Sequence, residues 1–261
     1  MSSTAWSSGD HYEPFMGRWS RLVGADFLDW FDAPPGLRWL DIGCGTGALT
    51  EAIALSADPR QLTGVDPSES FVDFARSRLG DRAIIEVADA THLPLDEDAV
   101  DVAVAGLVLN FVTDLVRSLA EISRVVHPGG RAGAYVWDYA GGMQFLDLFW
   151  QAAGEVDASA RDFYESSRFG GWDRGRLERL LASIGTHAES HEIVVPTVFA
   201  NFDDYWMPFL GGQGPAPSYV KSLDADRLAE LREVVRSSLP IAADGTISLT
   251  ARAWAVRCIV N

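Results

Sequence analysis

Three glycines at alternating positions form the strongest chemical signal in the chain, within Leu40-Asp41-Ile42-Gly43-Cys44-Gly45-Thr46-Gly47-Ala48. Glycine adopts backbone conformations closed to other residues and lets a ligand approach the main chain. The free amides at the start of a following helix bind carboxylates and phosphates. The run also fits the Gly-x-Gly-x-x-Gly/Ala dinucleotide fingerprint, with Ala48 last. The pattern therefore indicates a nucleotide-type ligand without specifying which one. The alternative is a tight turn with no ligand.

Two aspartates follow the next two apolar runs. Asp66, in Gly64-Val65-Asp66-Pro67-Ser68, lies close to the offset of roughly 20 residues expected for a ribose-binding acid. Its alternative role is a helix cap, which Ser68 can also fill. Asp89, in Val87-Ala88-Asp89-Ala90, is suited to accept a hydrogen bond from an exocyclic amine such as that of adenine, or is an exposed loop residue.

The elements that must position these residues alternate along the first half of the chain. Short apolar runs predict strands over 37–42, 61–65, 83–87, 100–109 and 131–137, and helical spacing predicts helices over 48–57, 68–79 and 115–126. Such alternation indicates parallel β-α-β units with right-handed crossovers, in a sheet covered on both faces.

The flanking segments follow a different pattern. Residues 11–31 have helical spacing, and Gly24 is expected to divide them into two helices. Beyond Asp138 the sequence predicts helices over 145–153, 174–184 and 224–239, and strands over 191–199 and 247–260. Between those strands, 202–217 is rich in aromatic residues, glycine and proline, and a connection of that length usually has a function or its own structure.

Composition and charge disfavour several kinds of partner and site. The 261 residues include 21 basic and 37 acidic side chains, a net charge of −16, which disfavours nucleic acids and anionic membranes as partners. Only two cysteines occur, and no Cys/His cluster indicates a metal. The N-terminus lacks a signal-peptide pattern, and no apolar run is long enough to span a membrane. These features predict a cytoplasmic protein.

Because of these motifs, residues 37–137 resemble the class I S-adenosylmethionine-dependent methyltransferases that act on small molecules. Five motifs occur in family order: the glycine loop from Leu40 to Gly47; Gly64-Val65-Asp66-Pro67-Ser68; Asp89-Ala90 with Leu93-Pro94; the strand Asp101-Val102-Ala103-Val104-Ala105-Gly106-Leu107-Val108-Leu109; and the turn His127-Pro128-Gly129-Gly130.

The resemblance implies an α/β fold, a Rossmann-like seven-stranded sheet that is mostly parallel with an antiparallel last strand. Helices would lie on both faces, with a helical cap inserted. It also implies S-adenosylmethionine as cofactor, S-adenosylhomocysteine as product, and contacts within the motifs: Asp41, Gly43, Cys44, Gly45, Gly47, Asp66, Pro67, Asp89, Ala90 and Gly106. Residues 1–36 are expected to form a helical lid on a domain spanning 37–261, in which 138–190 and 200–246 vary with substrate.

Candidates for the acceptor side lie outside the motifs. Arg18 and Trp19 are assigned to the cofactor, with Arg18 or Arg21 as partner of the methionine carboxylate. Asp138, Tyr139 and Asn110, which follow two predicted strands, are the catalytic candidates, to orient or deprotonate an acceptor. Aromatic residues are expected to line the acceptor pocket, although they also suit an ordinary core: Tyr12, Phe15, Tyr205, Trp206 and Phe209.

The sequence thus predicts methyl transfer to a small molecule by in-line displacement. An NAD-dependent oxidoreductase is the first alternative, but the chain has a single lysine, Lys221, which disfavours Tyr-x-x-x-Lys chemistry. The second is a non-catalytic cofactor-binding module, for which a broken glycine loop or a missing Asp66 would be expected; the chain has neither.

Overall fold

The computed structural model describes residues 17–211 and 214–261, except for the side chain of Arg168. The chain divides into two compact units. One, here called the sheet unit, comprises Ser20–Val136, Trp172–Ile193 and Ala253–Asn261. The other, the helical unit, comprises the described residues of three segments, 17–19, Trp137–Gly171 and Val194–Arg252. Each unit is described separately below.

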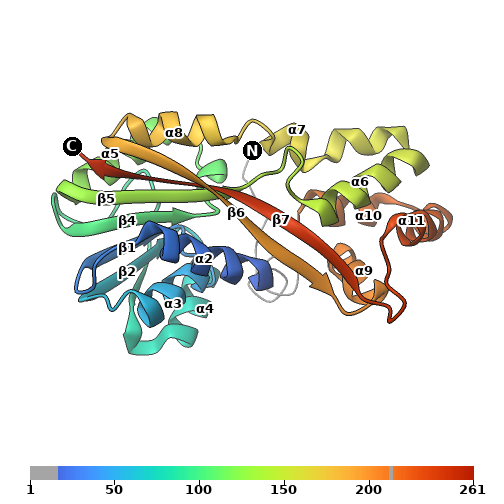
Figure 1. Ribbon diagram of the computed structural model, residues 1–261, viewed down its shortest axis with the longest axis horizontal. Helices are drawn as coiled ribbons and strands as arrows, with labels where there is room; N and C mark the ends of the chain where they lie inside the picture. Colours follow the sequence, from blue (N-terminus) through green and yellow to red (C-terminus); the bar gives the residue numbers. More distant parts are fainter. Residues whose placement is uncertain (1–16, 212–213) are drawn as a thin grey trace. The chain divides into compact units, whose positions relative to one another are not determined.

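Seven strands form one sheet in the order β3-β2-β1-β4-β5-β7-β6. The first five strands pair in parallel, and β7 runs antiparallel to its neighbours (Figure 1). The sequence predicted this seven-stranded Rossmann-like arrangement. The strands are β1 Arg38–Ile42, β2 Gln61–Asp66, β3 Ile84–Val87, β4 Val100–Gly106, β5 Val126–Trp137, β6 Gly185–Phe199 and β7 Ile247–Val260.

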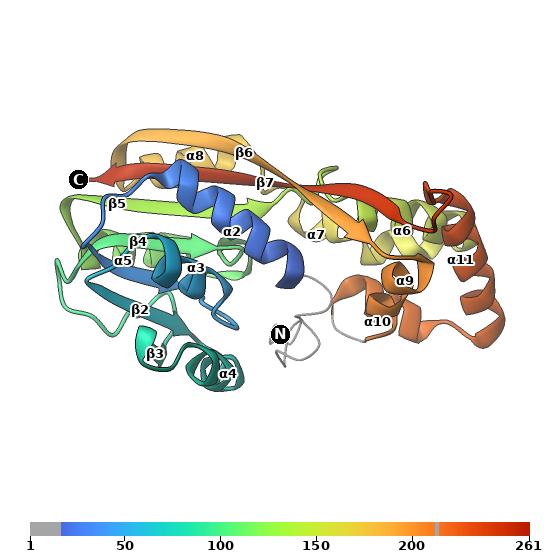
Figure 2. The same cartoon turned by 60° about the horizontal axis from the view of Figure 1, so that its bottom comes forward.

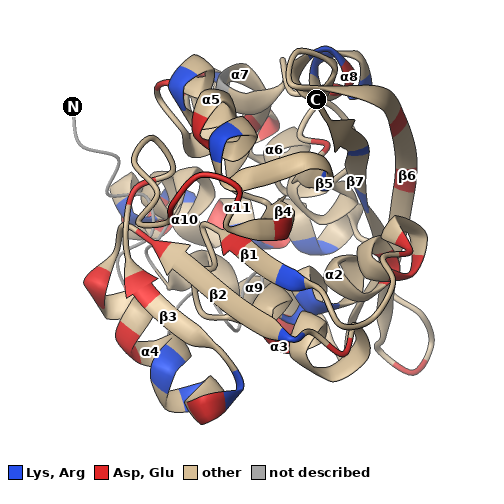
Figure 3. Ribbon diagram, turned by 90° about the vertical axis from the view of Figure 1, so that its left-hand side faces the viewer, with Lys and Arg blue, Asp and Glu red and all other residues tan. Residues whose placement is uncertain are grey.

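Helices cover both faces of the sheet unit. Helices α2 and α3 lie on one face and α5 and α8 on the other (Figures 1 and 3). The helices of this unit are α2 Arg18–Phe31, α3 Ala48–Ser56, α4 Glu69–Leu79, α5 Leu115–Val125 and α8 Arg174–Ala182, with short 3-10 turns η2 Gly80–Arg82 and η3 Leu109–Phe111.

The prediction that Gly24 divides two helices is wrong, because α2 continues through it. A Cβ at Gly24 would lie 3.5 Å from the hydroxyl oxygen of Tyr135 and 3.6 Å from Leu49, which is ordinary van der Waals contact, so packing does not require a glycine there. Phe27 and Phe31 are fully buried on the same side of α2, four residues apart, as the 3.6-residue helical period requires. The burial of these side chains outweighs the low helix propensity of glycine, which costs roughly 1 kcal/mol relative to alanine.

The helices of the helical unit are drawn in Figure 2, and aromatic side chains pack between them. The rings of Phe149 and Phe209 stack with centroids 4.2 Å apart, and the buried hydroxyl of Tyr205 donates to the carbonyl of Phe145 at 2.6 Å. Its helices are α6 Gln144–Val156, η4 Ala158–Phe163, α7 Glu165–Phe169, α9 Phe202–Leu210, α10 Pro215–Ser222 and α11 Ala225–Ser238. In neither unit does the described chain contain a helix of the length and hydropathy that crossing a membrane requires.

Candidate functional site

The glycine loop is fixed to the end of the neighbouring strand by backbone hydrogen bonds. The amides of Gly43 and Cys44 both donate to the carbonyl of Val65, at 2.7 and 2.9 Å, and the amide of Gly47 donates to the carbonyl of Cys44 at 2.9 Å. Since β1 and β2 pair in parallel, their carboxyl ends meet at one edge of the sheet. The loop is therefore held at the edge where open α/β sheets bind ligands.

Gly43 and Gly45 have the same sign of φ but different surroundings. Both lie in the left-handed region, with φ of +70° and +53°. A Cβ at Gly43 would lie 2.3 Å from Val108, so a side chain there is excluded by packing. Around Gly45, in contrast, no described atom outside Gly45 and its two chain neighbours lies within 4 Å of the position of a Cβ. Gly45 therefore leaves open space against bare backbone, as a bound ligand would require.

Asp66 joins the second strand to the glycine loop. Its carboxylate accepts hydrogen bonds from the amide of Gly45 at 3.0 Å and from the amide of Ser68 at 2.9 Å, and the residue is only 7% exposed. Burial raises the pKa of Asp66, while the two amides act to lower it. The carboxylate thus organises the start of α4, the alternative weighed from the sequence, and at the same time positions the loop.

Asp41 is a buried acid directly before the loop, 1% exposed. One carboxylate oxygen accepts a hydrogen bond from the Thr50 hydroxyl at 2.6 Å, and the other has no partner among the described residues. Burial, helped by the negative charge of Asp66, raises the pKa of Asp41 to about 7. A buried acceptor without a donor costs free energy unless a partner arrives. The site therefore has a place for a hydrogen-bond donor of a ligand.

The third aspartate lies in the loop after β3. Asp89 is exposed and accepts hydrogen bonds from the amide and hydroxyl of Thr91, at 2.8 and 2.6 Å, which lower its pKa. Ala90 follows it, and Pro67 is exposed after the end of β2. Since β1, β2 and β3 are adjacent and parallel, the three motifs lie in order along one edge of the sheet.

The remaining candidates of the sheet unit differ in exposure. The Cys44 thiol is buried against α4 residues, and this burial raises its pKa well above the usual range. A Cβ at Gly106 would lie 2.6 Å from the hydroxyl oxygen of Tyr135, so this glycine accommodates that side chain. Asn110 is half-buried in η3, after β4.

The catalytic candidates of the helical unit are Asp138 and Tyr139. Asp138 is 5% exposed, and its carboxylate accepts hydrogen bonds from the amide of Ala140 at 3.0 Å and the guanidinium of Arg252 at 2.6 and 2.8 Å. The ring of Tyr139 packs at 5.3 Å from that of Phe169. The ion pair fixes the segment after β5, and the assignment of either residue to proton transfer stays a prediction.

Arg18 and Trp19, assigned to the cofactor, also belong to the helical unit. The Arg18 guanidinium donates to Asp204 at 3.1 Å and lies over the rings of Trp19 and Phe199, at 4.3 and 4.7 Å from their centroids. Tyr205, Trp206 and Phe209 are buried side chains of α9 that pack against other rings of the helical unit. Tyr12 and Phe15 lie outside the described residues.

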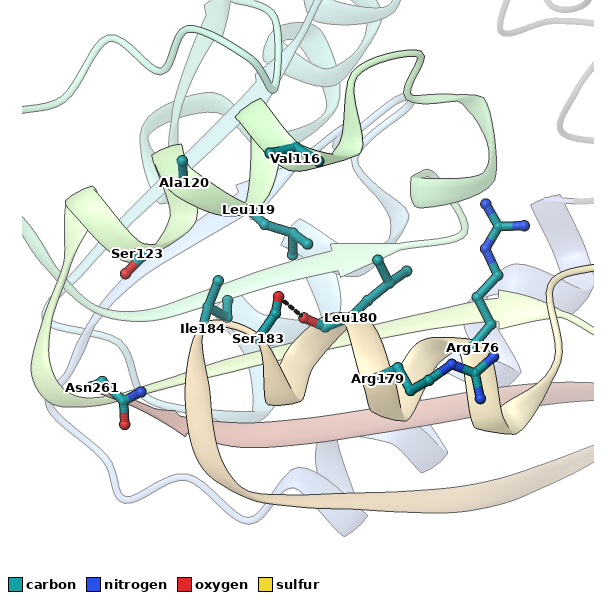
Figure 4. Close-up of a pocket in the computed structure, with 10 residues that line it drawn as sticks. All are labelled: Val116, Leu119, Ala120, Ser123, Arg176, Arg179, Leu180, Ser183, Ile184 and Asn261. Atoms are coloured by element: carbon teal, nitrogen blue, oxygen red, sulfur yellow. Dashed lines mark hydrogen bonds between the residues drawn. The ribbon is translucent and has the colours of Figure 1, made fainter.

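Two acidic residues and a surface hollow were not predicted from the sequence motifs. Asp147 and Glu165 line a cavity of the helical unit and have raised pKa values. In the sheet unit, a hollow of about 640 Å³ between α5 and α8 is lined by none of the candidates (Figure 4). Apolar side chains form its floor, including Leu119 and Leu180, and Arg176 and Arg179 of α8 border it.

Comparison with known proteins agrees with this geometry. Residues 40–133 match the model of a methyltransferase domain family. The demethylmenaquinone methyltransferase of Desulfitobacterium hafniense is 37% identical over 105 residues, which cover 38% of this chain and 42% of that protein. The matched segment spans less than half the length of the curated relatives.

Two solved structures share the fold over nearly the whole chain. The YcgJ protein of Bacillus subtilis matches with a TM-score of 0.60 at 16% identity, covering 92% of this chain and 98% of that one. The phosphoethanolamine N-methyltransferase 2 of Haemonchus contortus, solved with phosphomonomethylethanolamine and S-adenosylhomocysteine, matches with a TM-score of 0.58 at 16% identity, covering 96% and 56%. The match of residues 40–133 to the methyltransferase domain model agrees with the resemblance seen in their motifs, and the two solved structures support the fold.

Proposed function

We propose that the protein transfers the methyl group of S-adenosylmethionine to a small-molecule acceptor. The observation that carries the proposal is the open space at Gly45, bordered by a loop that the carboxylate of Asp66 holds in place. The family of residues 40–133 and the name of the Desulfitobacterium hafniense relative support the same activity.

The residues at the sheet edge suit the parts of this donor. The open space at Gly45 gives the donor room to approach the loop. The unpartnered oxygen of Asp41 is suited to accept a hydrogen bond from an ammonium group. Asp66 is assigned to the ribose hydroxyls, and Asp89 with Ala90 to the adenine.

When bound, the donor supplies a methyl group on a positively charged sulfur, which is displaced in line by the acceptor atom. The protein contributes chiefly by holding the two reactants aligned, about 3–3.5 Å apart. An alcohol or phenol acceptor also needs a base, whereas an amine that is already unprotonated does not. Asp138, Tyr139 and Asn110 stay the proposed residues for such a role.

The net charge of the protein supports the proposed acceptor class. The net charge of −16 supports a small molecule in preference to a nucleic acid. Both cysteines are buried free thiols, which supports a cytoplasmic, reducing location.

Calorimetric titration tests the proposal directly. S-adenosylhomocysteine and S-adenosylmethionine are expected to bind and NAD to leave no signal, and incubation with a metabolite library is expected to yield products heavier by one methyl group in mass spectrometry. Binding of NAD without S-adenosylhomocysteine would support the oxidoreductase instead. Binding of S-adenosylmethionine without turnover of any metabolite would support a cofactor-binding module.

A further inference from the structure

A cavity of about 430 Å³ lies entirely within the helical unit. It is lined by the segment that follows β5, from Tyr139 to Met143, by one side of α6, and by residues 164–166 at the start of α7. Its volume falls within the range of roughly 300–1,000 Å³ typical of small-molecule sites.

Aromatic side chains form part of the cavity wall, and their positions are fixed. The rings of Trp150 and Tyr164 lie with centroids 4.9 Å apart, and the Tyr164 hydroxyl donates to the backbone carbonyl of Trp150 at 2.9 Å. A Cβ at Gly154 would lie 2.9 Å from that hydroxyl oxygen, so the glycine leaves room for it. Ring faces attract organic cations through their negative quadrupole, most strongly for Trp.

The segment after β5 is equally constrained. The amide of Asp138 donates to the carbonyl of Arg252 at 2.9 Å, and the amide of Arg252 donates to the carbonyl of Gly142 at 2.7 Å. Gln144 accepts a hydrogen bond from the amide of Thr250 at 2.8 Å. These bonds tie the wall that contains Tyr139 to the first half of β7, so the cavity is preformed.

Two acids face this cavity. Glu165, 6% exposed, accepts hydrogen bonds from the Trp150 indole and, at 3.4 Å, from the amide of Ala216. Burial raises the pKa of Glu165 to about 7, with a further contribution from the charge of Asp147. Burial also raises the pKa of Asp147 to about 6, and the negative charge of Asp138 adds to the effect.

Neither acid has a cationic partner among the described side chains that line the cavity, since none of these is Arg, Lys or His. The guanidinium of Arg252 is bound to Asp138. A carboxylate that is partly buried without a counter-ion is costly to ionise. An arriving cation would remove that cost, which gives the site a preference for positive charge.

We propose that this cavity binds the ammonium group of an organic amine, with Asp147 as its counter-ion and the rings of Trp150 and Tyr164 against its apolar part. The carboxylate of Glu165 supplies a second hydrogen-bond acceptor, which is more deeply buried in the cavity wall. The site is defined by binding alone and can be tested without methyl transfer.

Binding of an ammonium group should change the protonation of Asp147. The negative charge of Asp138, which is paired with Arg252, raises the pKa of Asp147, and a hydrogen bond with the backbone of Met143 lowers it. Asp147 in turn raises the pKa values of Glu165 and Tyr205. An ammonium beside Asp147 favours its ionised form and lowers its pKa. Near pH 6, where the free carboxyl is about half protonated according to its pKa of about 6, uptake of the amine should therefore release protons.

Isothermal titration with phenethylamine and with its neutral analogue 2-phenylethanol tests the proposal on the full chain. The amine is expected to bind roughly tenfold or more tightly than the alcohol, since a charged hydrogen-bonded pair is worth about that much. Asp147→Asn should remove this difference, and it should fold, because the native site already tolerates an uncharged Asp147. Glu155→Gln, at an exposed position of the same helix, is the matched control and should bind like the wild type.

Titrations near pH 6 in two buffers with different ionisation heats measure the released protons. The wild type is expected to release protons and Asp147→Asn to release fewer. Equal affinity for amine and alcohol, or undiminished amine binding in Asp147→Asn, would refute the proposal. So would the absence of binding of both phenethylamine and benzyltrimethylammonium at about 10 mM, a concentration that detects even millimolar affinity.

Discussion

The backbone amide of Gly45 donates a hydrogen bond to the carboxylate of Asp66, with 3.0 Å between nitrogen and oxygen. The bond joins a loop after the first strand to the last residue of the second, 21 residues later. One acidic side chain thereby sets the position of the loop. Changes at either residue should affect both the loop and any ligand it holds.

Asp66→Ala is expected to weaken binding of S-adenosylhomocysteine by about 1.5–3 kcal/mol, roughly 10- to 150-fold, because it removes charge-assisted hydrogen bonds to the loop and the proposed ones to the ribose. Calorimetric titration measures the effect. Asp73→Ala, which removes an exposed acid from the helix that follows, is the control and should leave the affinity unchanged. Equal affinities of Asp66→Ala and the wild type would place the ribose elsewhere.

Gly45→Val should abolish cofactor binding in a folded protein, because the side chain would occupy the open space beside the loop. The matched control is Gly36→Val. Gly36 also has a positive φ, +77°, and no described atom lies within 4 Å of its Cβ position. Both variants carry comparable backbone strain, on the order of 1–3 kcal/mol. Only Gly45→Val should lose the calorimetric signal. If both variants lost it, backbone strain and not the occupied space would explain the loss of binding.

Asp41 makes the stability of the protein depend on pH. Its pKa is raised from 3.8 to about 7, so the native state retains a proton that the unfolded state releases. The contribution of this group to stability is therefore greatest below pH 4 and falls as the pH rises towards 7, by about 4 kcal/mol at most. The substitution Asp41→Asn should remove this pH-dependent contribution to stability.

Urea unfolding at pH 5 and pH 8, without cofactor, checks the prediction for Asp41. The stability of the variant relative to the wild type should increase between the two pH values, because the wild type alone ionises a buried carboxyl. Parallel curves for the two proteins over this range would contradict the assignment of the raised pKa to Asp41.

Trp206→Ala tests whether the aromatic side chains of α9 serve the core or an acceptor. Trp206 is 4% exposed and its ring lies 6.1 Å from that of Phe202. Truncation is expected to cost about 3–5 kcal/mol of stability while leaving the affinity for S-adenosylhomocysteine unchanged. Met207→Ala, at a 62% exposed position of the same helix, should be nearly neutral in thermal melting. A stable Trp206→Ala with impaired acceptor turnover would support the predicted acceptor pocket instead.

Local patterns predicted the sheet and the cofactor loop because both depend on short-range signals. Apolar runs marked β1 to β5, and the spacing of Gly43, Gly45 and Gly47 marked the turn between β1 and α3. The prediction for Gly24 was wrong because its low helix propensity is visible in the sequence, whereas the complete burial of Val23 and Phe27 in the same helix is not.

Long-range pairing explains what the sequence did not predict. Arg18 bonds to Asp204 across 186 positions, and Asp138 to Arg252 across 114, and no local pattern marks either pair. Asp147 and Glu165 were missed for a related reason. Each stands alone in a helical sequence, and only burial, which depends on the folded chain, gives it an unusual pKa.

Strand β7 contributes residues 247–252 to the helical unit and 253–260 to the sheet unit. During synthesis on the ribosome this strand emerges after every other strand and helix of the described chain. Neither unit can acquire its full set of contacts until then, however early its other elements appear. Nascent chains paused before residue 247 should therefore expose unpaired strand edges. Such chains should be prone to aggregation and should bind chaperones.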